Sequence, residues 1–354
     1  MKILHIVQTL KMGGIEKLVF TMAQADLSNV YVLAIEGDEE QSVKAWPMLA
    51  SCKDNLFFAN KKQGFKTDVI TNIRKICNNH AISLIHTHHI GPLLYASLAT
   101  AMMKHIRHVH TEHDAWHLNY WKNKYIQTVL LKLNKKINLV AVSQHVSEKL
   151  KILFPKKDIS LIRNAVDTKR FQPGDKLLAR SHLNLPTSCV ILGTAGRLEE
   201  VKGQRFLIDA MLLLPNNFYL AISGQGSLHK TLLQQISSLG LSDRVKLLGG
   251  LEEMEVFYQA CDVMCLPSLH EGLPLSLLEA QACDIPVVSS DVGGCYEGVD
   301  PDSGTLVPSM DAEAIASACL SSLQKAVKPR DFVLKNFSFE SLLDKYNQLY
   351  MKNL

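Results

Sequence analysis

Short apolar segments recur along the chain, and most of them are apolar at every position instead of every second one. Longer stretches of mixed polarity separate each segment from the next. Continuous apolar segments of this kind are typical of parallel strands buried on both faces, and the stretches between them have the length of helices. The pattern therefore predicts repeated strand–helix units, which form a parallel sheet covered by helices on both faces.

The expected strands form two series. The first series is Lys2–Gln8, Val30–Ile35, Asn55–Ala59, Ile82–His86, Arg107–Thr111, Asn138–Val142 and Ile159–Arg163. The second is Cys189–Ala195, Phe218–Ser223, Val245–Leu248, Val263–Leu266, Pro286–Ser289 and Thr305–Pro308. Helices are expected between them, for example at Ile15–Leu27, Asp68–Asn78, Gln204–Leu214 and Leu275–Ala282.

The two series are separated by a polar stretch, Asp167–Pro186, which contains Pro173 and Gly174. With 354 residues, and roughly 150 residues per domain as a prior, the chain is expected to form two doubly wound α/β domains of similar size. Open parallel sheets bind ligands outside the carboxyl ends of their strands, so the cleft between two such domains is the expected site.

Composition excludes several classes of protein. Hydrophobic residues make up 47% and charged residues 20%, as in an ordinary globular protein. The longest mainly apolar run, Leu93–Met103, has 11 residues, two of them Ser or Thr, and a bilayer span needs about 20. The first residues read as a strand instead of a signal peptide. Eight cysteines without a C-x-x-C pair indicate reduced thiols, so we expect a cytoplasmic protein.

Charge is distributed unevenly along the chain. Between Lys104 and Lys157 there are 11 basic and three acidic residues, whereas the whole chain carries a net charge of +4. The aromatic and basic stretch Trp116–Lys136 has the composition of an interfacial helix at an anionic membrane, and equally that of an acceptor-side helix packed on its own domain. No nucleic-acid-binding module is recognisable, so we expect no nucleic-acid partner.

Two glycine-containing loops follow expected strands. Gly13 and Gly14 stand before the helix Ile15–Leu27, where backbone N–H groups could approach a phosphate; a tight turn would explain them as well. They do not form G-x-G-x-x-G, so a nicotinamide fingerprint is missing. In the second half, Arg197 follows a strand and Lys202 lies five residues further on. These cations could converge on one diphosphate, or could simply be surface charges.

The segment from Leu266 to Pro274 carries the strongest signal. It follows an apolar strand and leads into the helix Leu275–Ala282, with Pro274 expected in the first helical turn. The N–H groups of Gly272 and Leu273 could face an anion or a sugar oxygen. Glu279 stands about 7.5 Å along the helix from Pro274, so Glu271 and Glu279 could hold two hydroxylated parts of one extended ligand.

Glu271 and Glu279, within H-E-G-L-P-L-S-L-L-E-A, resemble the E-x7-E signature of the retaining glycosyltransferases of family four. The likeness covers nearly the whole chain. It includes the Gly13-Gly14 loop, Arg197 with Lys202, Gly224-x-Gly226, and the segment Arg163–Asp167, in which Ala165 replaces the glycine of the family's N-G-V-D hinge. The resemblance implies the GT-B fold, with an acceptor domain at 1–166, a nucleotide-sugar domain at 167–332 and a carboxy-terminal segment at 333–354, whose helix Phe337–Leu349 crosses back to the first domain.

The resemblance also implies roles for individual residues. Arg197 and Lys202 would bind the donor diphosphate and stabilise its charge as it leaves, Glu271 would hold the donor sugar, and Glu279 would hold the ribose. The remaining donor-side residues would be Gly13, Gly14, Asn164, Gly196, Gly224, Gly226, Leu248, Gly272, Leu273 and Pro274. His113 would be the active-site histidine, and the acceptor side would include His110, Glu112 and Trp116.

The implied activity is a retaining, metal-independent glycosyl transfer without a cofactor. The donor would be a nucleotide-diphosphate sugar, with a UDP-sugar expected first, and the acceptor a growing or lipid-linked glycan. A front-face mechanism and a covalent intermediate on Glu271 both remain open. So do two other functions, a sugar-nucleotide epimerase and a non-catalytic sugar-nucleotide-binding protein.

Two patterns suggest a metal and are discounted. Nine of the 14 histidines lie between His80 and His117, but their spacing is not that of a usual zinc site. Asp300-Pro301-Asp302 spells D-x-D, yet it stands in a loop bounded by glycine and proline, where a surface turn explains it better.

Overall fold

The computed structural model describes residues 1–101, 103, 105–134, 136–324 and 328–352. Lys104 and Lys135 of the basic stretch therefore lie outside the described residues, as do Met102 of the apolar run and the last two residues of the segment 333–354. The chain divides into two compact units. The first unit is Met1–Ile162 with Lys345–Leu354, and the second unit is Arg163–Asp344. This division falls at 162/163, whereas the resemblance implied 166/167.

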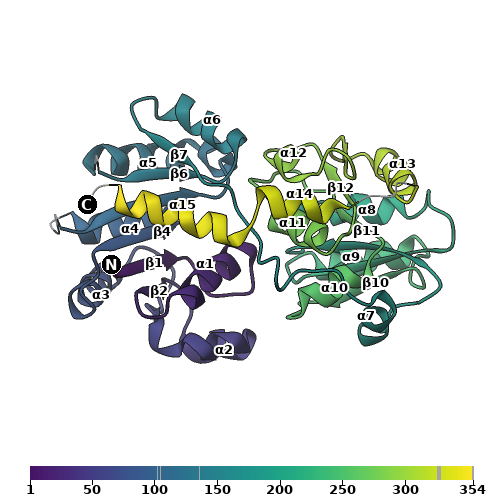
Figure 1. Cartoon of the computed structure of the whole chain (residues 1–354), viewed down its shortest axis with the longest axis horizontal. Coiled ribbons are helices and arrows are strands. Elements are labelled where there is room, and N and C mark those ends of the chain that lie inside the picture. Colours follow the sequence, from purple (N-terminus) through teal and green to yellow (C-terminus); the bar gives the residue numbers. More distant parts are fainter. Residues whose placement is uncertain (102, 104, 135, 325–327, 353–354) are drawn as a thin grey trace. The chain divides into compact units, whose positions relative to one another are not determined.

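The first unit is a parallel α/β layer structure (Figure 1). Its elements are β1 (Ile3–Val7), α1 (Gly14–Ala25), β2 (Val30–Ala34), α2 (Glu39–Ala45), η1 (Pro47–Asn55), β3 (Leu56–Phe58), α3 (Thr67–Asn79), β4 (Leu84–His88), α4 (Ile90–Thr100), β5 (Arg107–Glu112), η2 (Trp116–Asn119), α5 (Trp121–Leu133), β6 (Asn138–Ala141), α6 (Gln144–Leu153) and β7 (Ile159–Leu161). The seven-stranded sheet has the order β3-β2-β1-β4-β5-β6-β7.

The second unit repeats this architecture. Its elements are α7 (Lys176–His182), β8 (Val190–Ala195), η3 (Glu200–Lys202), α8 (Gln204–Ala210), β9 (Phe218–Ser223), α9 (His229–Ser238), β10 (Val245–Gly249), α10 (Met254–Ala260), β11 (Val263–Leu266), α11 (Leu275–Ala282), β12 (Val287–Ser290), α12 (Cys295–Gly298), β13 (Thr305–Val307), α13 (Ala312–Ser322), α14 (Pro329–Asn336) and the first part of α15 (Phe339–Met351). The six-stranded parallel sheet has the order β10-β9-β8-β11-β12-β13.

All strands of each sheet are parallel, but in each sheet the strand order reverses at one point. In the first unit this point is between β1 and β4, and in the second it is between β8 and β11. Loops that leave adjacent strands in opposite directions open a crevice there, which is where doubly wound sheets bind ligands. The two predicted α/β domains are therefore confirmed, and the loops after these strands are the places to look for chemistry.

The apolar strands account for the core of each unit. In the second unit Leu192, Leu220 and Val263 are inaccessible or almost so and pack with residues of α8 and α13. In the first unit Leu4, Ile6 and Ile85 pack against residues of α3 and α4. Strands buried on both faces cannot alternate polar with apolar residues, and this is the pattern that the sequence showed.

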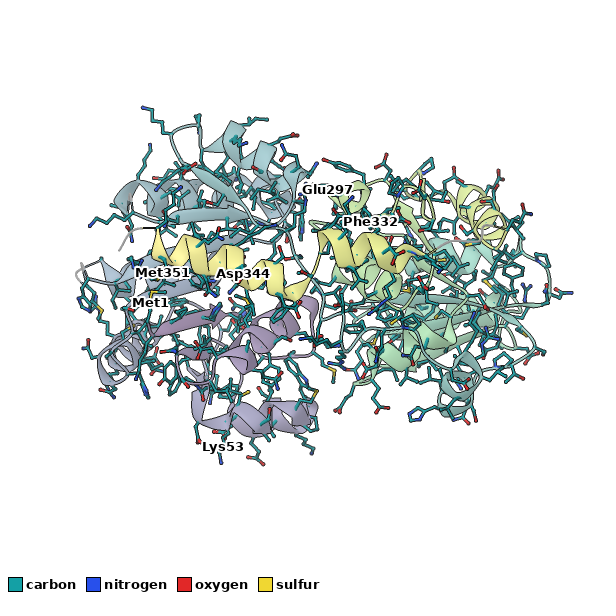
Figure 2. All side chains as sticks on the ribbon, in the orientation of Figure 1. Met1, Lys53, Glu297, Phe332, Asp344 and Met351 are labelled. Atoms are coloured by element: carbon teal, nitrogen blue, oxygen red, sulfur yellow. The ribbon has the colours of Figure 1, made fainter. Side chains whose placement is uncertain are left out.

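The last helix joins the first unit through its carboxy-terminal turns. Tyr346 Oη hydrogen bonds with Thr111 Oγ1 at 3.0 Å, and Tyr350 Oη with His86 Nδ1 at 2.7 Å. Arg107 donates to the Tyr350 carbonyl and to the sulfur of Met1, and Figure 2 shows Met1 and Met351 at the same edge of this unit. The chain thus returns to its first unit, as the predicted Phe337–Leu349 helix implied, although the helix lies two residues later.

Candidate active site

The candidate donor site of the second unit is built on the loops that follow β8 and β11. These strands are neighbours, so their carboxyl ends lie at the same edge of the sheet. The Leu269 N–H donates to the Val201 carbonyl at 2.8 Å, which fastens one loop to the other. Gly203 has φ +63°, and a Cβ there would lie 2.0 Å from the Pro267 carbonyl oxygen. The loops can therefore approach this closely only because residue 203 is glycine.

An ion pair forms the centre of the loops. Lys202 Nζ lies 2.6 Å from Glu271 Oε1, and the Ser268 hydroxyl donates to the same carboxylate oxygen at 2.6 Å. The Glu271 side chain is only 9% exposed and that of Lys202 21%. A carboxylate so poorly hydrated needs such partners, which also hold its other oxygen in a fixed direction. Ser268 was not among the predicted residues.

Backbone packing shapes the rest of this site. The Asn164 side-chain amide donates to the Leu273 carbonyl at 2.8 Å, so it holds the loop that precedes α11. Gly293 has φ +58°, and a Cβ there would lie 1.9 Å from the Glu271 carbonyl oxygen. Pro274 precedes the helix as its N-cap, with ψ 124°, and α11 starts at Leu275. The expectation that Pro274 lies in the first helical turn is therefore wrong by one position.

Glu279 lies on α11 beside the aromatic Tyr258 of α10. The Tyr258 hydroxyl donates to Glu279 Oε2 at 2.5 Å. Burial, followed by the charge of Glu279, raises the pKa of Tyr258 well above its usual value, so the phenol keeps its proton. Tyr258 thereby fixes one oxygen of Glu279 and leaves Oε1 for another partner.

The other predicted donor-side residues of this unit fall into two groups. Gly196, Gly224 and Gly226 form a close contact, in which a Cβ on Gly224 would lie 1.9 Å from the Gly196 carbonyl oxygen and one on Gly226 2.4 Å from that of Leu198. Gly272 and Leu273 are buried, and Leu248 is half-buried in β10. Arg197 is exposed, and within the described residues its guanidinium forms no ion pair with Glu271.

The predicted residues of the first unit occupy two places. Gly13 is the N-cap of α1 and Gly14 its first residue. His110 and Glu112 lie on β5, His113 follows it, and Trp116 begins η2. The His110 ring nitrogen Nε2 lies 3.4 Å from Glu112 Oε2, and the Gln127 amide donates to the same oxygen at 2.7 Å.

His117 and Asp114 form a partly buried pair next to these residues, 3.2 Å apart. Burial alone would lower the pKa of His117, but the hydrogen bond that its ring donates to Asp114 and the charges of Glu112 and Asp114 outweigh it and raise the pKa. Burial would raise the pKa of Asp114, and the hydrogen bond and charge of His117 outweigh that effect and lower it. Both shifts favour the charged pair.

The structure also bears on the D-x-D motif, the cysteines and the membrane-span prediction. Asp300 accepts hydrogen bonds from the Ser303 hydroxyl and, through its carbonyl, from the Gly304 N–H. D-x-D therefore forms the expected turn, although Asp300 itself is buried and only Pro301 and Asp302 lie at the surface. All eight cysteines, each in the described part of the chain, are free. Within the described residues no helix is long and apolar enough to cross a membrane.

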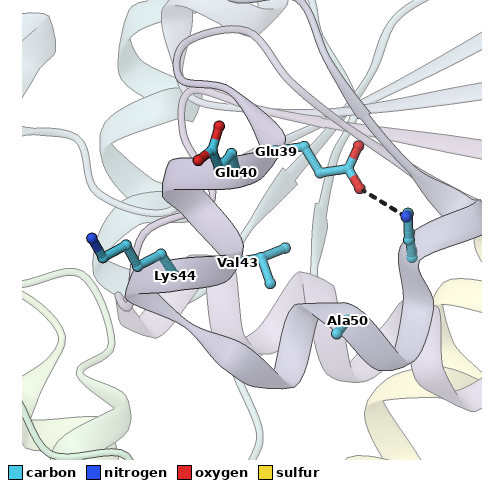
Figure 3. Close-up of a pocket in the computed structure, with 6 residues that line it drawn as sticks. Glu39, Glu40, Val43, Lys44 and Ala50 are labelled. Atoms are coloured by element: carbon cyan, nitrogen blue, oxygen red, sulfur yellow. Dashed lines mark ion pairs between the residues drawn. The ribbon is translucent and has the colours of Figure 1, made fainter.

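A surface hollow on α2 and η1 is separate from the candidate site residues. It is lined by Glu39, Glu40, Val43, Lys44, Ala50 and Lys53 (Figure 3). Glu39 and Lys53 are 3.8 Å apart and their side chains are more than half exposed, so this ion pair is weak. No predicted site residue lines the hollow.

Two parallel α/β units, each with one switch point in its strand order, are the architecture of the GT-B class. Proteins of known structure and sequence families support this assignment. The structure is similar over 100% of both chains to that of HepE from Anabaena, crystallised with UDP and glucose, with a TM-score of 0.85 and 22% identity. The profile described as Glycosyl transferases group 1 matches residues 175–335, and that described as Glycosyltransferase Family 4 matches residues 12–170. The chain therefore belongs to family four of the glycosyltransferases.

Curated relatives match part of the chain. The D-inositol 3-phosphate glycosyltransferase of Stackebrandtia nassauensis is 38% identical over 169 residues, which are 43% of this chain and 38% of that protein. The lipopolysaccharide core biosynthesis mannosyltransferase LpsB of Rhizobium meliloti is 31% identical over 171 residues, 45% of this chain and 49% of that protein. The matched region thus spans less than half of either relative.

Proposed function

We propose that the protein is a retaining glycosyltransferase that moves a hexose or N-acetylhexosamine from a nucleotide-diphosphate sugar to a hydroxyl of a growing glycan. The observation that carries the proposal is the partly buried group of Lys202, Glu271 and Ser268 on two loops at the switch point of the second unit. This group supplies one cation for a diphosphate and one fixed carboxylate for sugar hydroxyls. Family membership supports the same chemistry.

In this proposal the ion pair between Lys202 and Glu271 breaks when the donor binds, and each residue then contacts a different part of the donor. The Lys202 ammonium would leave Glu271 for a diphosphate oxygen and stabilise the charge of the departing nucleotide. Glu271, still held by Ser268, would accept hydrogen bonds from the donor sugar. Glu279, with Oε2 held by Tyr258, would offer Oε1 to the ribose. Arg197 would add a second cation from its exposed position.

We propose a UDP-sugar as donor and a reaction that needs no metal. A structure similar in fold was solved with UDP and glucose, which supports the choice of donor. The cations that would neutralise the diphosphate are side chains, so no divalent ion is required for that purpose. The acceptor is proposed to be a surface or lipid-linked glycan, in keeping with the mannosyltransferase of lipopolysaccharide core synthesis among the relatives.

A membrane surface is a further proposed partner. At the start of α5 the side chains of Tyr120, the N-cap residue, and of Trp121 and Tyr125 are 61%, 72% and 65% exposed, while Gln127, Leu130 and Leu131 of the same helix are buried. One face of α5 thus packs on its own unit and the other presents aromatics beside Lys122 and Lys124. Trp121→Ser should weaken binding to anionic vesicles about tenfold, and Leu178→Ser, at an exposed leucine of the second unit, should not.

The test of the proposed function is release of UDP from UDP-glucose, followed in the presence of EDTA with and without oligosaccharide acceptors. Release by the wild-type protein, lost in Glu271→Gln, is expected, and the anomeric configuration of the product, read by NMR, should be that of the donor. An epimerised sugar nucleotide without UDP release would indicate an epimerase instead. Saturable UDP binding without turnover of any sugar would indicate a binding protein.

A further inference from the structure

Three buried imidazoles form a row through the first unit. His5 Nδ1 lies 3.1 Å from His88 Nε2, and His88 Nδ1 lies 2.9 Å from His113 Nε2. His5 and His88 are 1% exposed and His113 is 7% exposed. His88 therefore uses both ring nitrogens to join a histidine of β1 to the candidate active-site histidine after β5.

The fold explains why these rings meet. Strand β1 pairs with β4 so that His5 stands beside His86, and His88, two residues further along β4, faces the same side of the sheet. Strand β5 is the next neighbour of β4, and His113 directly follows it. The His5 and His88 rings are nearly parallel, with 5.4 Å between their centroids.

The surroundings of all three rings favour the uncharged form at neutral pH. Burial lowers the pKa of His5 and that of His113 to about 3. Burial, followed by the charges of His86, His113 and His5, lowers the pKa of His88 well below its usual value. A neutral imidazole has one N–H donor and one acceptor nitrogen.

This property leaves the row only two arrangements. If His5 donates from Nδ1, then His88 accepts at Nε2 and donates from Nδ1, and His113 accepts at Nε2 and carries its own proton on Nδ1. If His113 donates from Nε2, every ring is protonated on Nε2 instead. To pass from one arrangement to the other, a proton must enter at His5 Nε2 and another must leave His113 Nδ1, so no ring can reverse alone.

One end of the row is unsatisfied. Among the described residues no side chain or backbone group hydrogen bonds to His113 Nδ1, although this atom is buried. The neighbouring His89 also has a buried Nδ1 without a partner, and its ring centroid lies 6.0 Å from that of His113. A buried polar atom without a partner needs an explanation, and a bound ligand oxygen supplies one.

We propose that His88 and His5 are positioning residues that fix the tautomer of His113, and so decide whether its Nδ1 donates a hydrogen bond to a substrate oxygen or accepts one from a substrate hydroxyl. The inference rests on the proposed function for the identity of the substrate. The row would thereby give His113 a defined donor or acceptor atom at neutral pH.

A metal could use some of the same nitrogens. Ring nitrogens of His5, His86 and His88 lie within 4.8 Å of one another. However, both His88 nitrogens are used in the row, and those of His86 hydrogen bond with Tyr350 Oη and Thr111 Oγ1, each at 2.7 Å. An ion would have to break these bonds, so the row explains the contacts better.

The first test needs no substrate. Nitrogen NMR of the wild-type protein labelled on histidine, assigned with single-residue variants, identifies the protonated nitrogen of each ring. The expected result is that His5, His88 and His113 are protonated on the same atom, either all on Nδ1 or all on Nε2. Different tautomers within the row, or stoichiometric zinc in the purified protein, would overturn the proposal.

The second test separates positioning from simple packing. His88→Leu should release His113 to populate both tautomers and lower the turnover of UDP-glucose about tenfold with little change in KM. His88→Gln keeps one donor and one acceptor and should recover part of the loss. His108→Gln is the matched control, since His108 is also fully buried but bonds to Thr87 outside the row.

The outcomes distinguish the two proposals. A loss of turnover in His88→Leu with an unchanged His113 tautomer would contradict the positioning role. A uniform tautomer without any sugar transfer by the wild-type protein would leave the row intact and contradict the proposed function. If His88→Leu does not fold, the tautomers of His5, His88 and His113 measured in the wild-type protein still test the proposal.

Discussion

Among single residues, Lys202 is the most informative one to change, because this cation pairs with the Glu271 carboxylate in the structure and with a diphosphate in the proposed complex. Lys202→Ala should lower the release of UDP from UDP-glucose about 100-fold, with KM changed less than about threefold, since charge stabilisation grows as the nucleotide leaves. Lys230→Ala, at an exposed lysine on α9, is the control. Unchanged turnover with weakened binding would contradict the role of Lys202.

Glu279 and Tyr258 allow a separate test of the ribose contact. Tyr258→Phe removes the hydrogen bond that holds Glu279 Oε2, so UDP should bind about five- to tenfold more weakly. Glu279→Ala should weaken UDP binding further, and calorimetry can measure both changes. Equal UDP affinity of Glu279→Ala and wild type would show that the carboxylate does not contact the nucleoside.

Sequence reasoning selected Glu271 and Glu279 but missed the residues that hold them. Ser268 stands three residues before Glu271, and Tyr258 lies on another helix, so only the folded loops bring their hydroxyls to the carboxylates. The proximity of His5 and His113 was also invisible, because they are more than one hundred residues apart in the chain and touch only through His88. The roles of the predicted residues remain predictions.

At the element scale, the two loops of the donor site depend on Gly203. An alanine there would combine a left-handed backbone with a Cβ 2.0 Å from the Pro267 carbonyl, so Gly203→Ala should lower the free energy of unfolding by about 2–4 kcal/mol. Gly240 has a similar φ of +68° but no atom within 4 Å of a Cβ. Gly240→Ala should therefore cost only about 1 kcal/mol.

Denaturant unfolding of the two variants measures this difference. Equal destabilisation would show that the clash with Pro267 is relieved by movement of the loops, and the close packing would then not hold the site together. Retained UDP affinity in a strongly destabilised Gly203→Ala would contradict the view that the donor site depends on this contact.

Elements were predicted more completely than side-chain contacts. Each expected strand has a counterpart, because continuous apolar segments are a strong signal of parallel strands. The strand expected at Ile82–His86 instead spans Leu84–His88. Its buried histidines bond to distant partners that the local sequence does not reveal: His88 to two histidines of other segments, and His86 to two hydroxyl groups. The helix expected to reach Leu214 ends at Ala210 and continues as turns before Pro215.

At the scale of the whole molecule, the buried histidines make stability depend on pH. Burial lowers the pKa of His5, His86, His88, His108 and His113 below the ordinary value of 6.5. Below pH 6.5 the unfolded chain therefore binds protons that the folded chain does not, and each such histidine removes about 1.4 kcal/mol of stability per pH unit. This stability is complete above pH 6.5 and is lost as the pH falls towards 3.

The measurement is the melting temperature between pH 7.5 and 5.5, which should fall steeply below pH 6.5. His108→Gln removes one of the five groups and should reduce the slope. A melting temperature that stays constant over this range would show that these rings are not held neutral, and the two arrangements of the histidine row would lose their basis.

The central claim is that the second unit binds a nucleotide diphosphate through Lys202 and Glu279. The most direct measurement is the thermal shift of the purified protein with UDP, GDP and ADP in EDTA, each compared with Lys202→Ala and Glu279→Ala. A ligand that binds only the folded state raises the melting temperature with concentration. A shift with UDP is therefore expected, and Glu279→Ala should reduce it strongly and Lys202→Ala only slightly, because Lys202 acts mainly on the departing nucleotide. No shift with any nucleotide at millimolar concentration, or a shift unaffected by both variants, would contradict the account.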